Sequence, residues 1–303
     1  MKIVVSGATG LIGSALVEAL TSGDHEVVPL VRRRPAAGEH AVAWDPERGS
    51  IDRAGLEGGD AVIHLAGENV FGRWSPAKKH RIRDSRVLGT RLLTDALASL
   101  ARPPATLLAA SAIGYYGDRG EEELSEQSAP GEDFLAHVSR DWETATAPAT
   151  RAGIRVVNMR FGVVLTTRDG ALAKMLPAFR LGLGGPIGSG NQYVSWIALP
   201  DAINAILHVL THADLFGPVN MTAPHPVSSR EFAKTLGKVL GRPAVVTVPA
   251  FALRMAFGAD GAAMLQSGQR VLPARLLASG FTFSLEALEP TLRYLLAPSE
   301  RAR

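Results

Sequence analysis

The stretch that decides the fold is KIVVSGATGLIG, residues 2–13. The apolar run over residues 2–6 predicts a buried strand, and apolar residues then recur at helical spacing until Gly23 ends the helix. Glycines at positions 7, 10 and 13 separate the two elements. In a βα turn that binds a dinucleotide, the first glycine allows a tight turn, the second admits a pyrophosphate and the third lets helix and strand pack closely. The stretch therefore predicts a nucleotide-binding βαβ unit.

The free N–H groups and the dipole at the start of this helix favour an anion, so the loop is expected to hold the pyrophosphate. The alternative is a tight turn that binds nothing. The loop residues expected to bind the cofactor are Gly7, Ala8, Thr9, Gly10, Leu11, Ile12 and Gly13.

The end of the second predicted strand, residues 26–31, indicates which dinucleotide binds. An NAD site usually has an Asp or Glu there to hydrogen-bond the ribose hydroxyls. This chain has Arg32, Arg33 and Arg34 instead. A guanidinium can form paired hydrogen bonds to a 2′-phosphate, which a carboxylate would repel. We therefore predict NADP(H) in preference to NAD(H); the alternative is a solvated basic loop.

Further apolar runs predict strands over residues 60–66, 106–111 and 154–159. They are nearly unbroken, which indicates a parallel sheet covered on both faces. The predicted fold is α/β, with a Rossmann-type doubly wound parallel sheet and a smaller C-terminal α+β substrate domain. Proline and turn signals increase after residue 216, and a capping box at residues 228–231 opens a helix that Gly241 closes. We expect a Rossmann domain over 1–216 and a small domain over 217–303, to which residues 165–190 contribute.

Composition narrows the class of protein. Apolar residues make up 46% of 303, and there is no cysteine, which excludes a disulfide framework, thiolate metal sites and a cysteine nucleophile. No apolar run approaches a membrane span, and the N-terminal run is too short for a signal peptide. His208 and His212 lack a third ligand, so no metal site is predicted. A cytoplasmic protein is expected.

The net charge of +3 is small and the basic clusters are short, so no nucleic acid or membrane partner is expected. The expected partner is a small molecule, and the protein is expected to be a monomer or homodimer. One predicted helix carries basic residues that either meet an anionic group of that molecule or form a solvated face. These residues are Lys78, Lys79, Arg81, Arg83 and Arg86.

Several motifs together resemble a known superfamily. They are GATGLIG at 7–13, DAVIHLAG at 60–67, SAIGYYGD at 111–118, RFG at 160–162 and GSGNQ at 188–192. Joined with GEN at 67–69, DWE at 141–143 and QRVLP at 269–273, they resemble an atypical extended short-chain dehydrogenase/reductase of the NAD-dependent epimerase/dehydratase family with a C-terminal domain of unknown function. The resemblance covers essentially the whole chain. It implies an NAD(P)-binding Rossmann domain over which a small substrate domain closes.

The chain departs from this superfamily at the catalytic positions. Extended members use a tyrosine and a lysine four residues later, assisted by a Ser or Thr and an Asn. The matching positions are Leu135 and Ser139 (Phe134 and Val138 with a one-residue slip), Ala112 and Arg86. A proton relay through tyrosine is therefore not expected.

Substitute acids and bases are expected at strand ends, where open α/β sheets bind ligands. The catalytic candidates are Glu68, Ser111 and Tyr116. Glu68 would be a base and Tyr116 an acid if burial moves their pKa values toward neutrality. Otherwise Glu68 only hydrogen-bonds its loop, and Tyr116 packs against the core and the cofactor ribose. Further cofactor contacts are expected from Leu65, Ala66, Gly67, Ser111, Arg160 and Gly162, besides Arg32 and Arg33.

The favoured hypothesis is an NADP(H)-binding oxidoreductase or epimerase-like protein that acts on an unidentified small molecule. Because the Tyr and Lys are absent, a non-catalytic NADP(H)-binding redox sensor or scaffold is the first alternative. A nucleotide-sugar epimerase/dehydratase is the second, although such enzymes usually favour NAD and keep the four catalytic residues.

Overall fold

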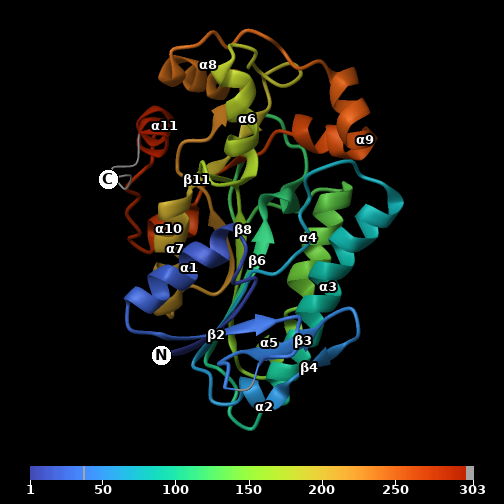
Figure 1. The fold of residues 1–303 in the computed structure, drawn as a ribbon, viewed down its shortest axis with the longest axis vertical. Helices are drawn as coiled ribbons and strands as arrows, with labels where there is room; N and C mark the ends of the chain where they lie inside the picture. Colours follow the sequence, from blue (N-terminus) through green and yellow to red (C-terminus); the bar gives the residue numbers. More distant parts are fainter. Residues whose placement is uncertain (37, 298–303) are drawn as a thin grey trace.

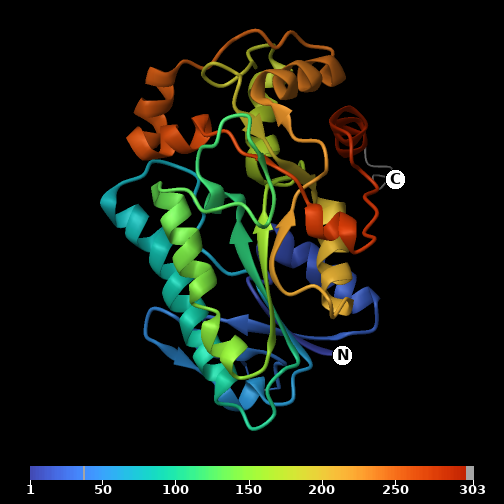
Figure 2. The same ribbon diagram turned by 180° about the vertical axis from the view of Figure 1, so that it is seen from behind.

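A computed structural model describes residues 1–36 and 38–297. An 8-stranded sheet forms its centre, in the order β12-β8-β6-β5-β1-β2-β3-β4 (Figures 1 and 2). Neighbouring strands are parallel except β3 and β4 at one edge. The strands are β1 (Lys2–Ser6), β2 (Glu26–Val31), β3 (Val42–Asp45), β4 (Ser50–Ile51), β5 (Ala61–His64), β6 (Thr106–Ala112), β8 (Arg155–Phe161) and β12 (Gly217–Met221). The predicted Rossmann-type doubly wound fold is confirmed.

Helices cover both faces of the sheet (Figure 1). One face carries α1 (Leu11–Ser22), α7 (Leu199–Thr211) and α10 (Ala274–Ala278). The other carries α2 (Arg53–Leu56), α3 (Pro76–Ala98) and α5 (Ala147–Arg151), and α4 (Phe134–Thr144) packs on α3. Successive residues of β1 serve the two layers: Ile3 and Val5 pack against α1 and α7, whereas Val4 packs against α3. This explains why β1 is apolar without interruption.

A smaller layer lies above the carboxyl ends of the strands (Figure 2). Here α6 (Gly170–Arg180), α8 (Ser229–Leu240) and α11 (Leu288–Leu296) share one apolar core. The predicted helix bounds are confirmed: Ser228 Oγ accepts a hydrogen bond from the Glu231 N–H, which is one half of a capping box, and Gly241 ends α8 at φ 64°. Short strand pairs connect the layers, together with η1 (Ile113–Tyr116) and α9 (Ala250–Gln266). The short strands are β7 (Glu123–Leu124), β9 (Val163–Leu165), β10 (Tyr193–Val194), β11 (Trp196–Ala198), β13 (Val227–Ser228) and β14 (Arg270–Val271).

The division expected at residues 216/217 does not match the sheet. β12 pairs in parallel with β8 from Gly217 to Met221, so the Rossmann sheet extends beyond residue 216. Residues 165–190 do contribute to the upper layer, because Leu172 and Phe179 of α6 pack with Phe232 and Leu236 of α8. Within the described residues, no helix combines the length and apolar character needed to cross a membrane.

A buried histidine fixes the end of β5 beneath the glycine loop. Ser6 Oγ accepts hydrogen bonds from the N–H groups of Leu65 (3.1 Å) and Ala66 (3.3 Å), so its own O–H donates to His64 Nδ1, 2.6 Å away. His64 Nε2–H then donates to Thr90 Oγ1 at 3.0 Å. Burial lowers the pKa of His64 to about 4, so this neutral, singly protonated ring persists well into acid.

This burial predicts an acid-sensitive fold. Below the ordinary histidine pKa of 6.5 the unfolded chain binds a proton that the folded chain refuses until about pH 4, so folding stability falls with pH across that window. Between about pH 7 and about pH 4.5 the wild type should lose about 2.5 kcal/mol more than His64→Gln, measured by urea unfolding. His80→Gln, at an exposed position, is the control and should keep the wild-type slope. Equal slopes for His64→Gln and wild type would contradict this assignment.

A candidate dinucleotide-binding site

The glycine loop is held by contacts that leave no room for a side chain. Gly7 has φ 69°, and a Cβ there would lie 2.9 Å from the Ala66 backbone nitrogen. A Cβ on Gly13 would lie 2.0 Å from the carbonyl oxygen of Gly7. The Gly10 N–H donates to that same oxygen at 2.9 Å, which closes the turn. These contacts support the predicted geometry of the loop, with the first and third glycines required by backbone approach.

Helix α1 begins at this loop without a protein group to satisfy its first N–H groups. Its N-cap residue, Gly10, offers no side chain, and the first turn contains no acidic residue. Ser75, Asp133 and Ser228 cap α3, α4 and α8, whereas α6, α7, α9 and α11 lack a side-chain cap as α1 does. The loop also lies where β1 has β2 on one side and β5 on the other, which is the switch point at which open α/β sheets bind ligands. This arrangement suits a pyrophosphate.

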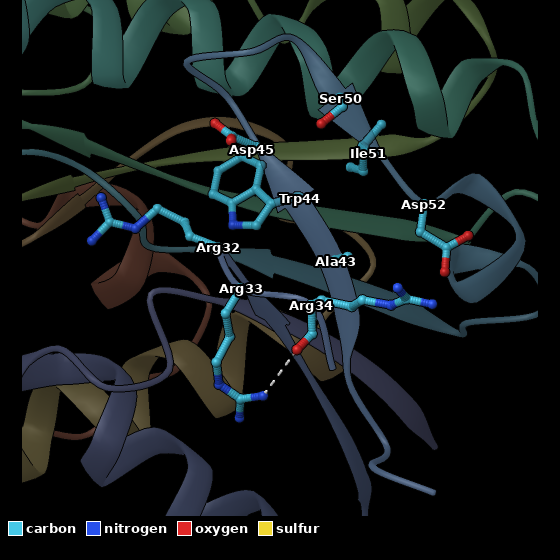
Figure 3. A pocket seen from close by; sticks show the side chains of 9 residues that line it. All are labelled: Arg32, Arg33, Arg34, Ala43, Trp44, Asp45, Ser50, Ile51 and Asp52. Carbon is cyan, nitrogen blue, oxygen red and sulfur yellow. Dashed lines mark hydrogen bonds between the residues drawn. The ribbon is translucent and has the colours of Figure 1, made fainter. Parts of the chain in front are cut away.

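The three arginines after β2 line a cavity of about 380 Å³ (Figure 3). Figure 3 shows Arg32 and Arg34 extending in opposite directions along this cavity, with the Trp44 indole between β3 and Arg32. Arg33 is held by Glu39: its Nη1 lies 2.7 Å from Oε2, and this pairing lowers the pKa of the Glu39 carboxyl to about 2. Arg33, one of the expected cofactor contacts, is thus engaged by a carboxylate of the protein itself, whereas Arg32 and Arg34 have no ion-pair partner within residues 1–36 and 38–297. Glu39 was not among the expected site residues, since its only signal in the sequence is its position in the loop after β2.

Glu68 does not have the pKa expected of a general base. Its Oε1 lies 2.7 Å from Lys78 Nζ and 3.6 Å from Arg81 Nε. The hydrogen bond from Lys78, with the charges of both cations, lowers the pKa of Glu68. The condition under which Glu68 would act as a base, a pKa moved toward neutrality, is therefore not met, because Lys78 and Arg81 of α3 pair with this carboxylate.

Tyr116 is also shifted away from neutrality. Its side chain is 0% exposed; its O–H donates to Asn220 Oδ1 at 2.7 Å and accepts from Arg160 Nη1 at 2.9 Å. Burial raises the pKa of Tyr116 to about 12. The condition under which Tyr116 would act as an acid, a pKa moved toward neutrality, is not met, because desolvation disfavours the phenolate more than Arg160 favours it.

Ser111 and Arg160 belong to the same buried network. Glu143 Oε1 accepts from Ser111 Oγ at 2.7 Å and from Arg160 Nε at 2.7 Å, while Oε2 accepts from Arg160 Nη2 at 2.8 Å. Arg160 is 2% exposed, and its guanidinium lies 3.5 Å from the centre of the Tyr115 ring. The side chain of Arg160 is therefore used inside the protein, and the expected contact between this guanidinium and the cofactor is not supported.

Other expected contact residues lie around the loop. Leu65 and Ala66 pack directly against Gly7, whereas Gly162 lies at the crossing with β11, where a Cβ would be 2.6 Å from the Ser195 carbonyl oxygen. Leu135 and Ser139, which replace the family's Tyr and Lys, both lie beside Gly114: Leu135 Cβ and Ser139 Oγ are 3.3 Å and 3.9 Å from where its Cβ would be. Of the three catalytic candidates, Ser111 and Tyr116 are connected through Glu143 and Arg160, whereas Glu68 pairs with Lys78 and Arg81 of α3.

The fold and this loop define an NAD(P)-binding Rossmann protein. Residues 3–221 match the NAD dependent epimerase/dehydratase family, and residues 248–295 match a domain of unknown function. The chain belongs to the NAD dependent epimerase/dehydratase family, as its motifs predicted.

Relatives and a solved structure agree over nearly the full length. The chain is 43% identical over 293 residues to epimerase family protein Mb2239 of Mycobacterium bovis, with 96% of each chain covered. It is 37% identical over 301 residues to epimerase family protein SDR39U1 of Homo sapiens, with 98% of this chain and 100% of that one covered. A crystal structure of the human protein with NADPH has a TM-score of 0.90 at 35% identity and covers 97% of this chain and 99% of that one.

The buried network predicts a large cost for breaking its ion pair. Glu143→Gln leaves the Arg160 guanidinium buried without its counter-ion, which should destabilise the fold by about 3–5 kcal/mol. The control is Glu123→Gln, which breaks a pair with Arg270 at 2.9 Å whose side chains are 55% and 36% exposed. That change should cost less than about 1 kcal/mol. Urea unfolding measures both, and similar losses for the two variants would contradict the role given to Glu143.

Proposed function

We propose that this protein binds NADP(H) and is an oxidoreductase that acts on a small keto or sugar-like compound. The observation that carries the cofactor preference is the pair of arginines at the end of β2, Arg32 and Arg34, which line a cavity and have no ion-pair partner among the described residues. Glu39 is bound to Arg33, and the two carboxylates that line the same cavity, Asp45 and Asp52, form no ion pair with Arg32 or Arg34 among the described residues. The NADPH in the similar human structure supports the same cofactor.

The chain's own groups divide the binding of this cofactor. N–H groups at the start of α1 hold the pyrophosphate, and Gly7 and Gly13 keep the loop close enough for that contact. Arg32 and Arg34 hold the 2′-phosphate at the end of β2. The cofactor, when bound, supplies or accepts the hydride. These residues fit NADP(H), because Gly7 and Gly13 present only backbone to the cofactor and no side chain caps the first N–H groups of α1.

Proton transfer cannot follow the usual route of the family. Leu135 and Ser139 carry no group that titrates near neutral pH, and the Tyr116 phenol is closed off by Arg160 and Asn220. Glu68 stays ionised at neutral pH because Lys78 lowers its pKa. In this proposal Glu68 accepts a hydrogen bond from a substrate hydroxyl, and water provides the proton.

A second candidate function follows from the absence of the family's catalytic tyrosine and lysine. A protein that binds NADP(H) without turning over substrate would need the glycine loop and the arginines but no acid or base. Leu135 beside Gly114 is the observation that favours it. A screen of carbonyl compounds for NADPH oxidation, followed by absorbance, distinguishes the two: turnover supports the oxidoreductase, and its absence across aldehydes, ketones and keto acids supports the sensor or scaffold. A nucleotide-sugar epimerase ranks third.

The cofactor preference is tested by calorimetry. NADPH should bind at least about tenfold more tightly than NADH, because charge-assisted hydrogen bonds to the 2′-phosphate are each worth about 1.5–3 kcal/mol. Arg32→Gln should reduce this difference by weakening NADPH alone. Arg48→Gln is the control, since Arg48 is exposed and does not line the cavity. Equal or tighter binding of NADH would contradict the preference, and binding of neither nucleotide would contradict the whole proposal.

A further inference from the structure

Arg86 of α3 is held inside the wall of the site beside the glycine loop. Its Cζ lies 3.4 Å from where a Cβ on Gly67 would stand and 4.9 Å from the centre of the Trp142 ring on α4. The Trp142 indole is fixed in turn, since its Nε1–H donates to Thr90 Oγ1 at 2.8 Å. The guanidinium therefore occupies a defined position between the end of β5 and α4.

The hydrogen bonds of Arg86 leave most of its donors unused. Only Nη1 donates to the protein, to the carbonyl oxygens of Glu68 (2.9 Å) and Ile82 (3.1 Å). Nε and Nη2 have no acceptor among the described residues, and neither belongs to the fully enclosed unpaired atoms. These donors remain accessible to a ligand.

The other cations of this helix face differ from Arg86. Lys78 pairs with Glu68, Lys79 with Asp260 at 2.8 Å and Arg83 with Asp141 at 3.1 Å. No carboxylate lies within ion-pair distance of Arg86 in the described parts of the chain. Burial lowers the pKa of Arg86 to about 10, so the group is desolvated yet charged at neutral pH. Arg86 is half-buried, and the charge of Glu68 offsets only part of its desolvation, so a ligand that accepts hydrogen bonds would offset more of that cost.

The position of Arg86 indicates which ligand. Gly67 follows β5 at the carboxyl edge of the sheet, directly after the Leu65–Ala66 segment that touches Gly7. Ser139, which stands where the family has a cofactor-side lysine, lies on α4 one turn before Trp142 and is 3% exposed. Arg86 thus places a cation from α3 beside α4, where position 139 is an uncharged serine and Arg140 is exposed.

We propose that Arg86 binds the nicotinamide-ribose half of NADP(H), with Nε and Nη2 donating to the ribose hydroxyls. This inference rests on the proposed binding of NADP(H). Stacking on Trp142 holds the planar guanidinium in place before the cofactor arrives, so little side-chain freedom is lost on binding. Arg86 supplies the positive charge that Ser139 cannot.

The test compares NADPH with 2′,5′-ADP, which has the adenosine half but no nicotinamide. In Arg86→Gln, NADPH should bind about 10–100-fold more weakly, the loss expected for charged hydrogen bonds. Binding of 2′,5′-ADP should stay within about twofold, since the arginines after β2 and the glycine loop are untouched. Arg83→Gln, which removes an exposed paired cation of the same helix, is the matched control and should change neither value. Calorimetry on the 303-residue chain measures the binding of NADPH and of 2′,5′-ADP to the wild type and to both variants.

Each contrary result has a separate meaning. Unchanged NADPH binding in Arg86→Gln overturns the inference, and so does an equal loss of both ligands, which indicates a role in the fold alone. If Arg86→Gln does not fold, Arg86→Lys carries the same comparison: it keeps the charge but not the paired donors, so only NADPH should weaken. Wild-type protein that binds 2′,5′-ADP but not NADPH also overturns the inference. Failure of the wild type to bind either ligand contradicts the proposed function itself.

Discussion

The buried ion pair between Glu143 and Arg160 determines what the rest of the site can do. It joins α4 to β8, and through Tyr116 and Asn220 it reaches β12 and the carbonyl oxygen of Leu272. A guanidinium that is 2% exposed is tolerated only when its donors are satisfied, and here a bidentate carboxylate and a phenol oxygen satisfy them. As a consequence, the hydroxyl groups of Ser111 and Tyr116 are engaged in hydrogen bonds of this network and are not available as an acid or a base.

The two halves of the site consequently follow different constraints. The loop that faces the cofactor is set by backbone contact, because Gly7 and Gly13 have no room for even a methyl group. The opposite side is set by charge: α3 presents Lys78, Arg81 and Arg86, of which the first two share Glu68. Under the proposed function, the glycine loop binds the anion and α3 supplies cations, while the pKa values of Glu68 and Tyr116 are both shifted away from neutrality.

Local signals account for what the sequence predicts correctly. Apolar runs identify the central strands, and the glycine spacing and the capping box identify a βα turn and α8, since each depends on residues close together in the chain. The boundary at residue 217 was misplaced because Gly217 and Pro218 read as a turn, although proline is acceptable at the start of an edge strand.

The pKa shifts of Glu68 and Tyr116 could not be predicted from the sequence for another reason. Burial and partners distant in sequence, such as Asn220 for Tyr116, decide them.

The departures from the family's catalytic positions are related through space. Losing a lysine at Ser139 removes a cation from α4, and an arginine at position 86 adds one from α3, stacked on the Trp142 that lies one turn beyond Ser139. The charge at the nicotinamide end is thereby kept while the tyrosine position becomes apolar. Such a site would keep a positive charge beside a bound dinucleotide but has no lysine to lower the pKa of a catalytic tyrosine. Under the proposed function, cofactor binding and proton transfer rest on different groups, in contrast to the Tyr–Lys pair that the family resemblance implies.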